Sequence, residues 1–283
     1  MADLGVPRLQ VEESRPRIYP SSILDDPLSW ETYGNGRFNP TEITATCKVV
    51  NYPEGESRVA VYYQLPDDIG QIVHVLNNPV ASKTPDDLFE QYQKDACERD
   101  MFQRHAMKTY VAEAASTPFE QCPESIRNAV DHIKYLCEGA LGPSDTQFNE
   151  LLSVAYAEGQ EMNFHSDDEP GLGPVVAGLT LGSSAEMMFR HNLSVKKNQT
   201  YKNGPYRASE SRTIEVQNER TLQITLSHGD LLIMNGTRIQ QQFEHAVFVR
   251  DTDLLRFAAT ARSINAGKIT NSSTSPRCSG QPA

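Results

Sequence analysis

Asn163-Phe164-His165-Ser166-Asp167-Asp168-Glu169 is the stretch around which this 283-residue chain is organised. It places an imidazole, His165, two residues before a carboxylate, Asp167. Residues two apart in a strand point to the same face, so both side chains would converge on one point. Such a pair is two-thirds of a 2-His-1-carboxylate iron site. The triplet alone is nevertheless more typical of a turn histidine beside solvated acids.

The composition is that of an acidic globular protein with a net charge of -11. The chain is long enough for one large domain or two small ones with a substantial core. It has no apolar run of membrane-spanning length, and residues 1–20 lack the apolar segment of a secretory signal. Five scattered cysteines without a C-x-x-C pair indicate reduced thiols in an intracellular compartment, cytoplasm or nucleus. The acidity argues against a broad nucleic-acid-coating surface but leaves room for a local basic patch.

Composition also divides the chain into an arm, one domain and a tail. Residues 1–20 carry Pro and charges with little periodicity, which predicts a flexible arm. Residues 264–283 are rich in Ser, Thr and Asn, which predicts a disordered tail. We expect residues 21–263 to form a single domain, with a lid region and helices over 21–146 and a core over 147–263.

The core region consists of short β-like runs separated by Gly, Asn and Asp. Their even spacing is typical of a barrel or a two-sheet jelly roll. They are 151–156, 161–164, 175–181, 185–189, 221–226, 231–234, 243–249 and 255–263. Upstream, the patterns predict strands over 43–50 and 57–65 and helices over 85–114 and 123–140. The fold class is therefore predicted to be α+β, and mainly β.

A second histidine and two arginines extend the pattern downstream. His245 lies in a predicted strand about eighty residues after His165. Arg256 and Arg262 share one face of the last strand by alternation. Two arginines on an inner face are costly unless anions pair with them, and a dicarboxylate such as 2-oxoglutarate would be a suitable partner. The alternative is a strand whose arginines face solvent.

In order and spacing, residues 147–263 resemble the AlkB family of Fe(II)- and 2-oxoglutarate-dependent dioxygenases. The matching stretches are Phe148-Asn-Glu-Leu-Leu152, Tyr156-x-x-Gly159, His165-Ser-Asp-Asp-Glu-Pro170, Val175–Gly182, Met188-Phe-Arg190, His228-Gly-Asp-Leu-Leu-Ile-Met-Asn-Gly236, His245-x-Val247 and Arg256-x-x-x-Thr260-x-Arg262. They cover a little under half of the chain, and residues 57–63 and 123–138 fit the preceding region of the family more loosely.

The resemblance implies a double-stranded β-helix, or jelly roll, with supporting helices and an N-terminal substrate lid. It implies His165, Asp167 and His245 as the ligands of Fe(II). It also implies 2-oxoglutarate and O2 as co-substrates, with succinate and CO2 as products.

The resemblance assigns the co-substrate to the last strand. Arg256 would pair with the distal carboxylate of 2-oxoglutarate, assisted by the Tyr156 hydroxyl, and Arg262 would lie near its other end. Two residues depart from the family, which has asparagine where this chain has Val154 and Ala258. Since both asparagines support the co-substrate in the family, we expect a rebuilt pocket.

Further side chains bear on the substrate. The resemblance places Glu169 where the family has an acid that reads the exocyclic amino group of a flipped base. It places Tyr62 or Tyr63 in the lid. Arg190 begins a stretch, 190–212, whose Lys, Arg and Tyr side chains could contact phosphates. The alternative for this stretch is a long surface loop.

Three functions stay open at this point. The first is oxidative dealkylation of an N-alkylated nucleobase in DNA or RNA, flipped out or single-stranded. The second is hydroxylation or desaturation of a small-molecule metabolite, including an amine-bearing one, on the same scaffold. The third is a non-catalytic binding module, which would leave the joint occurrence of metal ligands and arginines unexplained. We expect no membrane partner, and the sequence leaves the oligomeric state open.

Overall fold

In the computed structural model, most of the expected domain is described. The described residues are 36–38, 43–98, 108–111, 118–143, 146–156, 160–167, 171–192, 222–249 and 255–265. The expected arm, all but the first two residues of the expected tail, Glu169 and most of the 190–212 stretch lie outside them.

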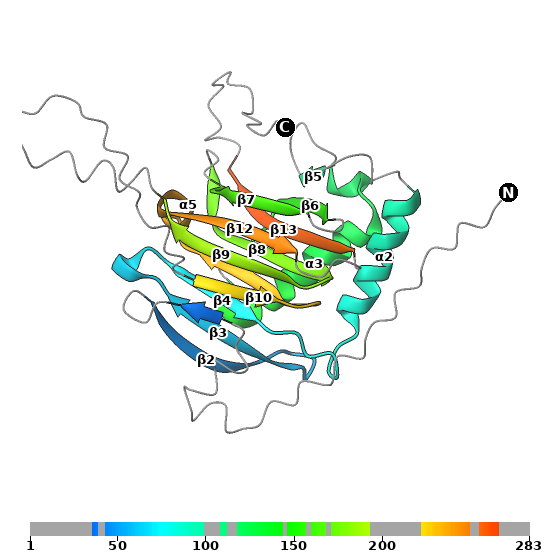
Figure 1. The fold of residues 1–283 in the computed structure, drawn as a ribbon. Coiled ribbons are helices and arrows are strands. Elements are labelled where there is room, and N and C mark those ends of the chain that lie inside the picture. Colours follow the sequence, from blue (N-terminus) through cyan, green and yellow to red (C-terminus); the bar gives the residue numbers. More distant parts are fainter. Residues whose placement is uncertain are drawn as a thin grey trace, which may run out of the picture.

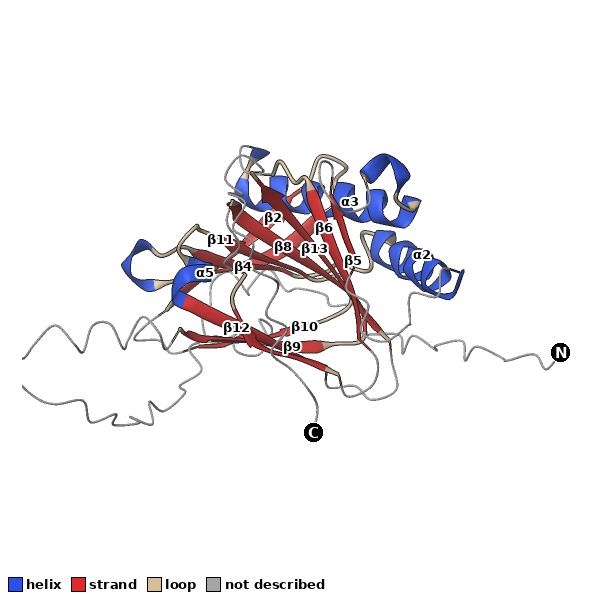
Figure 2. Ribbon diagram, turned by 90° about the horizontal axis from the view of Figure 1, so that it is seen from above, coloured by secondary structure: helices blue, strands red, loops and turns tan. Residues whose placement is uncertain are grey.

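Two antiparallel sheets face each other (Figures 1 and 2). In order across the larger sheet, the strands are β2 (Thr44–Asn51), β3 (Ser57–Gln64), β4 (Gln71–Val75), β11 (Leu231–Asn235), β8 (Leu172–Gly182), β13 (Arg256–Ile264), β6 (Glu150–Tyr156) and β5 (Lys108–Val111). In the smaller sheet they are β1 (Gly36–Phe38), β10 (Leu222–Leu226), β9 (Ala185–His191), β12 (Phe243–Val249) and β7 (Glu161–His165). The expectation of a mainly β fold is confirmed.

Two helices cover the outer face of the larger sheet (Figure 2). They are α2 (Thr84–Glu98) and α3 (Glu124–Leu141), and the shorter elements are α5 (Ile239–Gln242) and the 3-10 turns η2 (Pro66–Asp68) and η3 (Phe119–Gln121). Helix α3 turns Ile126, Ile133 and Cys137 toward the sheet, because residues three, four or seven apart share one helical face. It ends before Gly142, whose φ of 92° an L side chain rarely adopts. No described helix is long and apolar enough to cross a membrane.

Alternation along β13 shows how the larger sheet is buried on both faces. Phe257, Ala259 and Ala261 join the cluster between this sheet and the helices. Ala258 packs instead against the cluster between the two sheets, and Arg256 lies on that same face by alternation. The space between the sheets is therefore the interior in which inward-facing polar groups of β13 must find partners.

The predicted strands agree closely with the observed ones. All eight expected core strands are present, each with ends within three residues of those expected. The helix expected over 85–114 is shorter, because α2 ends at Glu98 and residues 108–111 form β5. The β-type residues of that segment complete the sheet edge by pairing with β6, and this pairing outweighs the local helical pattern.

Candidate metal centre and co-substrate pocket

The three predicted ligands converge at one end of the smaller sheet. His165 ends β7 and lies opposite His245 of β12 in the strand register, with ring centroids 4.3 Å apart. Asp167 follows two residues later, and its two carboxylate oxygens lie 3.7 Å from the Nε2 atoms of His165 and His245. All three donor atoms lie within 4.8 Å of one another. Ligands about 2.1 Å from one ion lie about 3 Å apart, so each side chain has to close by only about 1 Å.

Both imidazoles present the nitrogen that a metal needs. Nδ1 of His165 lies 2.8 Å from the Asn163 carbonyl oxygen. A proton on Nδ1 donates to that oxygen, which leaves the lone pair of Nε2 directed toward Asp167. Burial, and secondly the neighbouring His165, lower the pKa of His245 to about 3. His245 is therefore a neutral donor at physiological pH.

A glutamine that the sequence patterns did not single out holds the carboxylate ligand. Gln240 of α5 is buried, and its side-chain oxygen accepts a hydrogen bond from the backbone N–H of Asp167 at 3.1 Å. Its amide nitrogen lies 3.1 Å from Sδ of Met234. The segment between β11 and β12 therefore has two roles. Its Gln240 holds the backbone of Asp167 in place, and its end continues directly into β12, the strand that carries His245. The only signal in the sequence was a polar run just before that strand.

The cluster is open on one side. The His165 side chain is 33% exposed and Asp167 is 19% exposed, whereas His245 is 7% exposed. A substrate can therefore approach past His165 and Asp167, with His245 lining the inner wall.

Arg256 is buried between the sheets with unused donors. It is 2% exposed, and its Nη2 donates to Thr180 Oγ1 at 3.2 Å. The Nε and Nη1 atoms have no hydrogen-bond partner in the described part of the chain. A buried cation without an anion is destabilising by several kcal/mol, on the order of the cost of breaking a buried ion pair. The site therefore fits a bound carboxylate, which can accept two parallel hydrogen bonds from a guanidinium.

Tyr156 connects this arginine with the metal ligands. It lies opposite Arg256 in the β6–β13 register, and the guanidinium carbon is 4.9 Å from its ring centre. Burial raises the pKa of Tyr156, Arg256 lowers it and the Asp167 carboxylate raises it further. Tyr156 is thus within electrostatic reach of both groups, so a co-substrate held at Arg256 could extend toward the metal.

The two departures from the family lie together beside this pocket. Val154 of β6 and Ala258 of β13 are cross-strand partners, and both pack against the cluster between the sheets. One wall near Arg256 is therefore apolar.

Arg262 already has a partner within the protein. Its Nε donates to Oε2 of Glu150 at 2.6 Å, and both side chains are buried. Glu150 is its cross-strand neighbour, a match that pairing the two predicted strands could have found. The charge of Arg262 is thus balanced without 2-oxoglutarate, so its contact with the co-substrate stays a prediction.

Arg190 lies on the sheet face away from the candidate metal ligands, and its contact with a substrate stays a prediction. Its Nη2 lies 2.7 Å from Oε2 of Glu244, and its guanidinium lies 3.9 Å from the centre of the Phe164 ring. Phe164 and Glu244 immediately precede His165 and His245, so alternation places them on the opposite sheet face. Arg190 therefore stabilises the outer face of the smaller sheet.

Tyr62 and Tyr63 lie on opposite faces of β3, and their place in a substrate lid stays a prediction. Both are buried, because β3 has helices on one face and the second sheet on the other. The Tyr62 hydroxyl donates to the Ala140 carbonyl of α3 at 3.0 Å, on the face away from the metal ligands. Tyr63 packs among the apolar side chains between the sheets.

Comparison with known proteins gives a family and partial relatives. The profile of the 2OG-Fe(II) oxygenase superfamily matches residues 62–270. The alpha-ketoglutarate-dependent dioxygenase alkB homolog 3 of Mus musculus and that of Homo sapiens are each 36% identical to this chain over 103 residues. The alignments span 35% of this chain and 30% of each relative. The structure of Peruvianin-I, a cysteine peptidase from Thevetia peruviana latex, aligns over 42% of this chain and 53% of that chain at 14% identity. The TM-score of this alignment, 0.26, is too low to indicate a shared fold.

Proposed function

Since the chain belongs to the 2OG-Fe(II) oxygenase superfamily, we propose that it is an AlkB-like dioxygenase that oxidatively dealkylates an N-alkylated nucleobase in DNA or RNA. The superfamily uses Fe(II), 2-oxoglutarate and O2. The observation that carries the dioxygenase assignment is the convergence of two histidines and a carboxylate beside a buried arginine with unused donors. The partial similarity to alkB homolog 3 supports the nucleobase.

Each group of the site has a role in this proposal. Bound Fe(II), 2-oxoglutarate and O2 supply the oxidation of an unactivated C–H bond, with succinate and CO2 as products. His165, Asp167 and His245 hold the metal. Hydroxylation of an N-methyl group leaves a carbinolamine, which releases formaldehyde and restores the base.

Arg256 binds the distal carboxylate of the co-substrate, and Tyr156 orients it. The apolar pair Val154 and Ala258 closes one side of this pocket against water, which strengthens the charged contact at Arg256. We also propose that the two sheets form the family's double-stranded β-helix and that residues 21–146 include its lid.

A small-molecule substrate is the second candidate. Three observations support it: the apolar wall of Val154 and Ala258, the net charge of -11 and the pairing of Arg190 with Glu244. An amine-bearing metabolite would enter by the same open side past His165 and Asp167.

Succinate release distinguishes these functions. The purified protein, with Fe(II) and 2-oxoglutarate, is assayed with N-methylated and unmethylated oligonucleotides of DNA and RNA, and with a panel of amine-bearing metabolites. The proposal predicts succinate and formaldehyde in equal amounts with methylated oligonucleotides only. Stimulation by metabolites alone would replace the nucleobase with the second candidate. The Asp167→Ala variant gives the background, and succinate release equal to that background under all conditions would contradict the dioxygenase assignment itself.

A further inference from the structure

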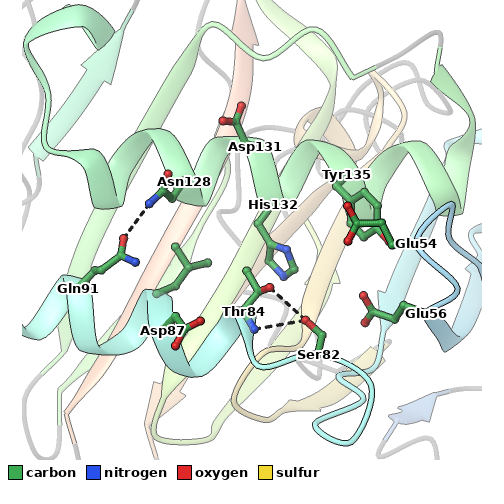
Figure 3. A pocket seen from close by; sticks show the side chains of 11 residues that line it. Glu54, Glu56, Ser82, Thr84, Asp87, Gln91, Asn128, Asp131, His132 and Tyr135 are labelled. Carbon is green, nitrogen blue, oxygen red and sulfur yellow. Dashed lines mark hydrogen bonds between the residues drawn. The ribbon is translucent and has the colours of Figure 1, made fainter.

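A separate pocket lies on the other side of the eight-stranded sheet from the metal ligands (Figure 3). Its volume is about 390 Å³, and residues of α2, α3 and the β2–β3 turn line it. Because α2 and α3 cover the outer face of the sheet, the sheet separates this pocket from the co-substrate site. A volume of this size suits a small molecule.

The lining of this pocket is strongly acidic. Its described lining residues include four carboxylates, from Glu54, Glu56, Asp87 and Asp131, and no Lys or Arg. Glu56 forms an ion pair with the buried Arg58. In the part of the chain that the structure describes, the other three carboxylates form no ion pair. The pocket therefore has a net negative potential that favours a cation.

An unpartnered nitrogen lies within this acidic lining. His132 of α3 is 7% exposed, and its ring projects into the space between α3 and α2 (Figure 3). Its Nε2 atom is buried and finds no hydrogen-bond partner among the residues that the structure describes. The nearby side chain of Asn128 does not reach this nitrogen, because its amide nitrogen donates a hydrogen bond to the side-chain oxygen of Gln91 at 2.9 Å. Since buried polar atoms are normally hydrogen-bonded, Nε2 indicates that a polar group of a ligand belongs here.

The arrangement does not suit a metal ion. Among the described residues, only His165, Asp167 and His245 bring three donor atoms within metal-binding reach of one another. In Figure 3, Glu54 and Asp87 instead lie toward opposite ends of the pocket, with His132 between them. Separated carboxylates match a ligand whose positive charges are also separated.

We propose that this pocket binds a small aliphatic polyamine. Its terminal ammonium groups pair with Glu54 and Asp87, and an N–H group in between donates to Nε2 of His132. Charge-assisted hydrogen bonds of this kind are about twice as strong as neutral ones, so the two carboxylates account for most of the affinity.

Calorimetric titration with spermidine tests this site in the intact protein loaded with Fe(II) and 2-oxoglutarate without oxygen. We expect one saturable site, no heat from 1,4-butanediol, and little competition from Mg2+ at equal ionic strength. The double substitution Glu54→Gln and Asp87→Asn should weaken spermidine binding by about tenfold or more. The matched control, Glu120→Gln and Glu124→Gln, removes the same charge at exposed positions that do not line the pocket and should bind as the wild type does.

A third variant, His132→Gln, checks the central contact, with its melting temperature as a measure of folding. If it melts cooperatively, its affinity should fall by several-fold. The proposal is overturned if spermidine gives no saturable heat, or if the control weakens binding as much as the pocket variant. Displacement by Mg2+ at equal ionic strength would also overturn it, because that result indicates nonspecific attraction.

Discussion

The carboxylate ligand lies beyond the end of its strand, so its position depends on a neighbour. The side-chain oxygen of Gln240 accepts a hydrogen bond from the backbone N–H of Asp167, and Gln240 is itself buried. We predict that Gln240→Leu weakens metal affinity by about tenfold or more, as is typical when a group supporting a ligand is lost. Titration with Co(II), followed by its absorption spectrum, measures this. Gln241→Leu, an exposed neighbour, is the control. Equal affinities in the two variants would remove Gln240 from the site.

The second prediction at the scale of a single residue concerns the role of Arg256 in 2-oxoglutarate binding. Its Nε and Nη1 lack partners among the described residues, so Arg256→Ala should cost about 2 kcal/mol or more in 2-oxoglutarate binding, at least about 30-fold in KM. In the absence of 2-oxoglutarate, the same change should not destabilise the fold, because it removes an uncompensated buried charge. Arg127→Ala, on the surface of α3, is the control. An unchanged KM would contradict the assignment.

At the scale of secondary-structure elements, the alternation of side chains predicted where the strands lie far better than it predicted what packs on each of their faces. The period of two identified which residues of β13 share a face and where nearly every core strand lies. It could not say what covers each face. It placed Tyr62 and Tyr63 on opposite faces of β3, but it did not indicate that both faces are buried. In β9, the pairing with β12 shows which face is which. Phe189 lies opposite His245 on the inner face, and Arg190 lies opposite Glu244 on the outer face.

The same limit explains which site residues were found. The three candidate ligands and Arg256 belong to a spaced motif, so the sequence indicated them, and the structure brings the three candidate ligands together. Gln240 and Glu150 become visible only through pairing between distant segments: α5 against the end of β7, and β6 against β13.

The β6–β13 pair also carries a stability prediction. Glu150 and Arg262 form a buried ion pair, so Glu150→Leu removes the carboxylate that balances the buried charge of Arg262 and should cost about 3–5 kcal/mol. Combining Glu150→Leu with Arg262→Met should recover most of this loss, because it removes the second charge as well. Urea unfolding of both variants measures the difference. A double variant no more stable than Glu150→Leu alone would show that the pair matters for more than its charge.

At the scale of the whole molecule, the helix layer makes the fold sensitive to acid. His132 of α3 is buried, and burial, with a smaller effect of Arg58, lowers its pKa from 6.5 to about 3. The unfolded chain therefore binds this proton at higher pH than the folded one does. The stability linked to His132 is complete above pH 6.5 and is lost as the pH falls from there toward 3.

We predict that His132 accounts for about 2 kcal/mol of lost stability between neutral pH and pH 5. Urea unfolding at both pH values, in the wild type and in His132→Gln, isolates this contribution from that of His245, which shifts in the same direction. The variant should lose less stability on acidification. An identical loss in both proteins would contradict the prediction.

Dioxygenase activity requires the metal and 2-oxoglutarate to occupy the same space between the sheets. Anaerobic titration of 2-oxoglutarate into the Fe(II)-loaded protein tests this directly, because chelation of Fe(II) by a 2-oxo acid gives a visible charge-transfer band. We predict a saturable band in the wild type, no band in Asp167→Ala, and a band in Arg256→Ala only at much higher 2-oxoglutarate. Absence of the band from the wild type, or its persistence in Asp167→Ala, would contradict the account.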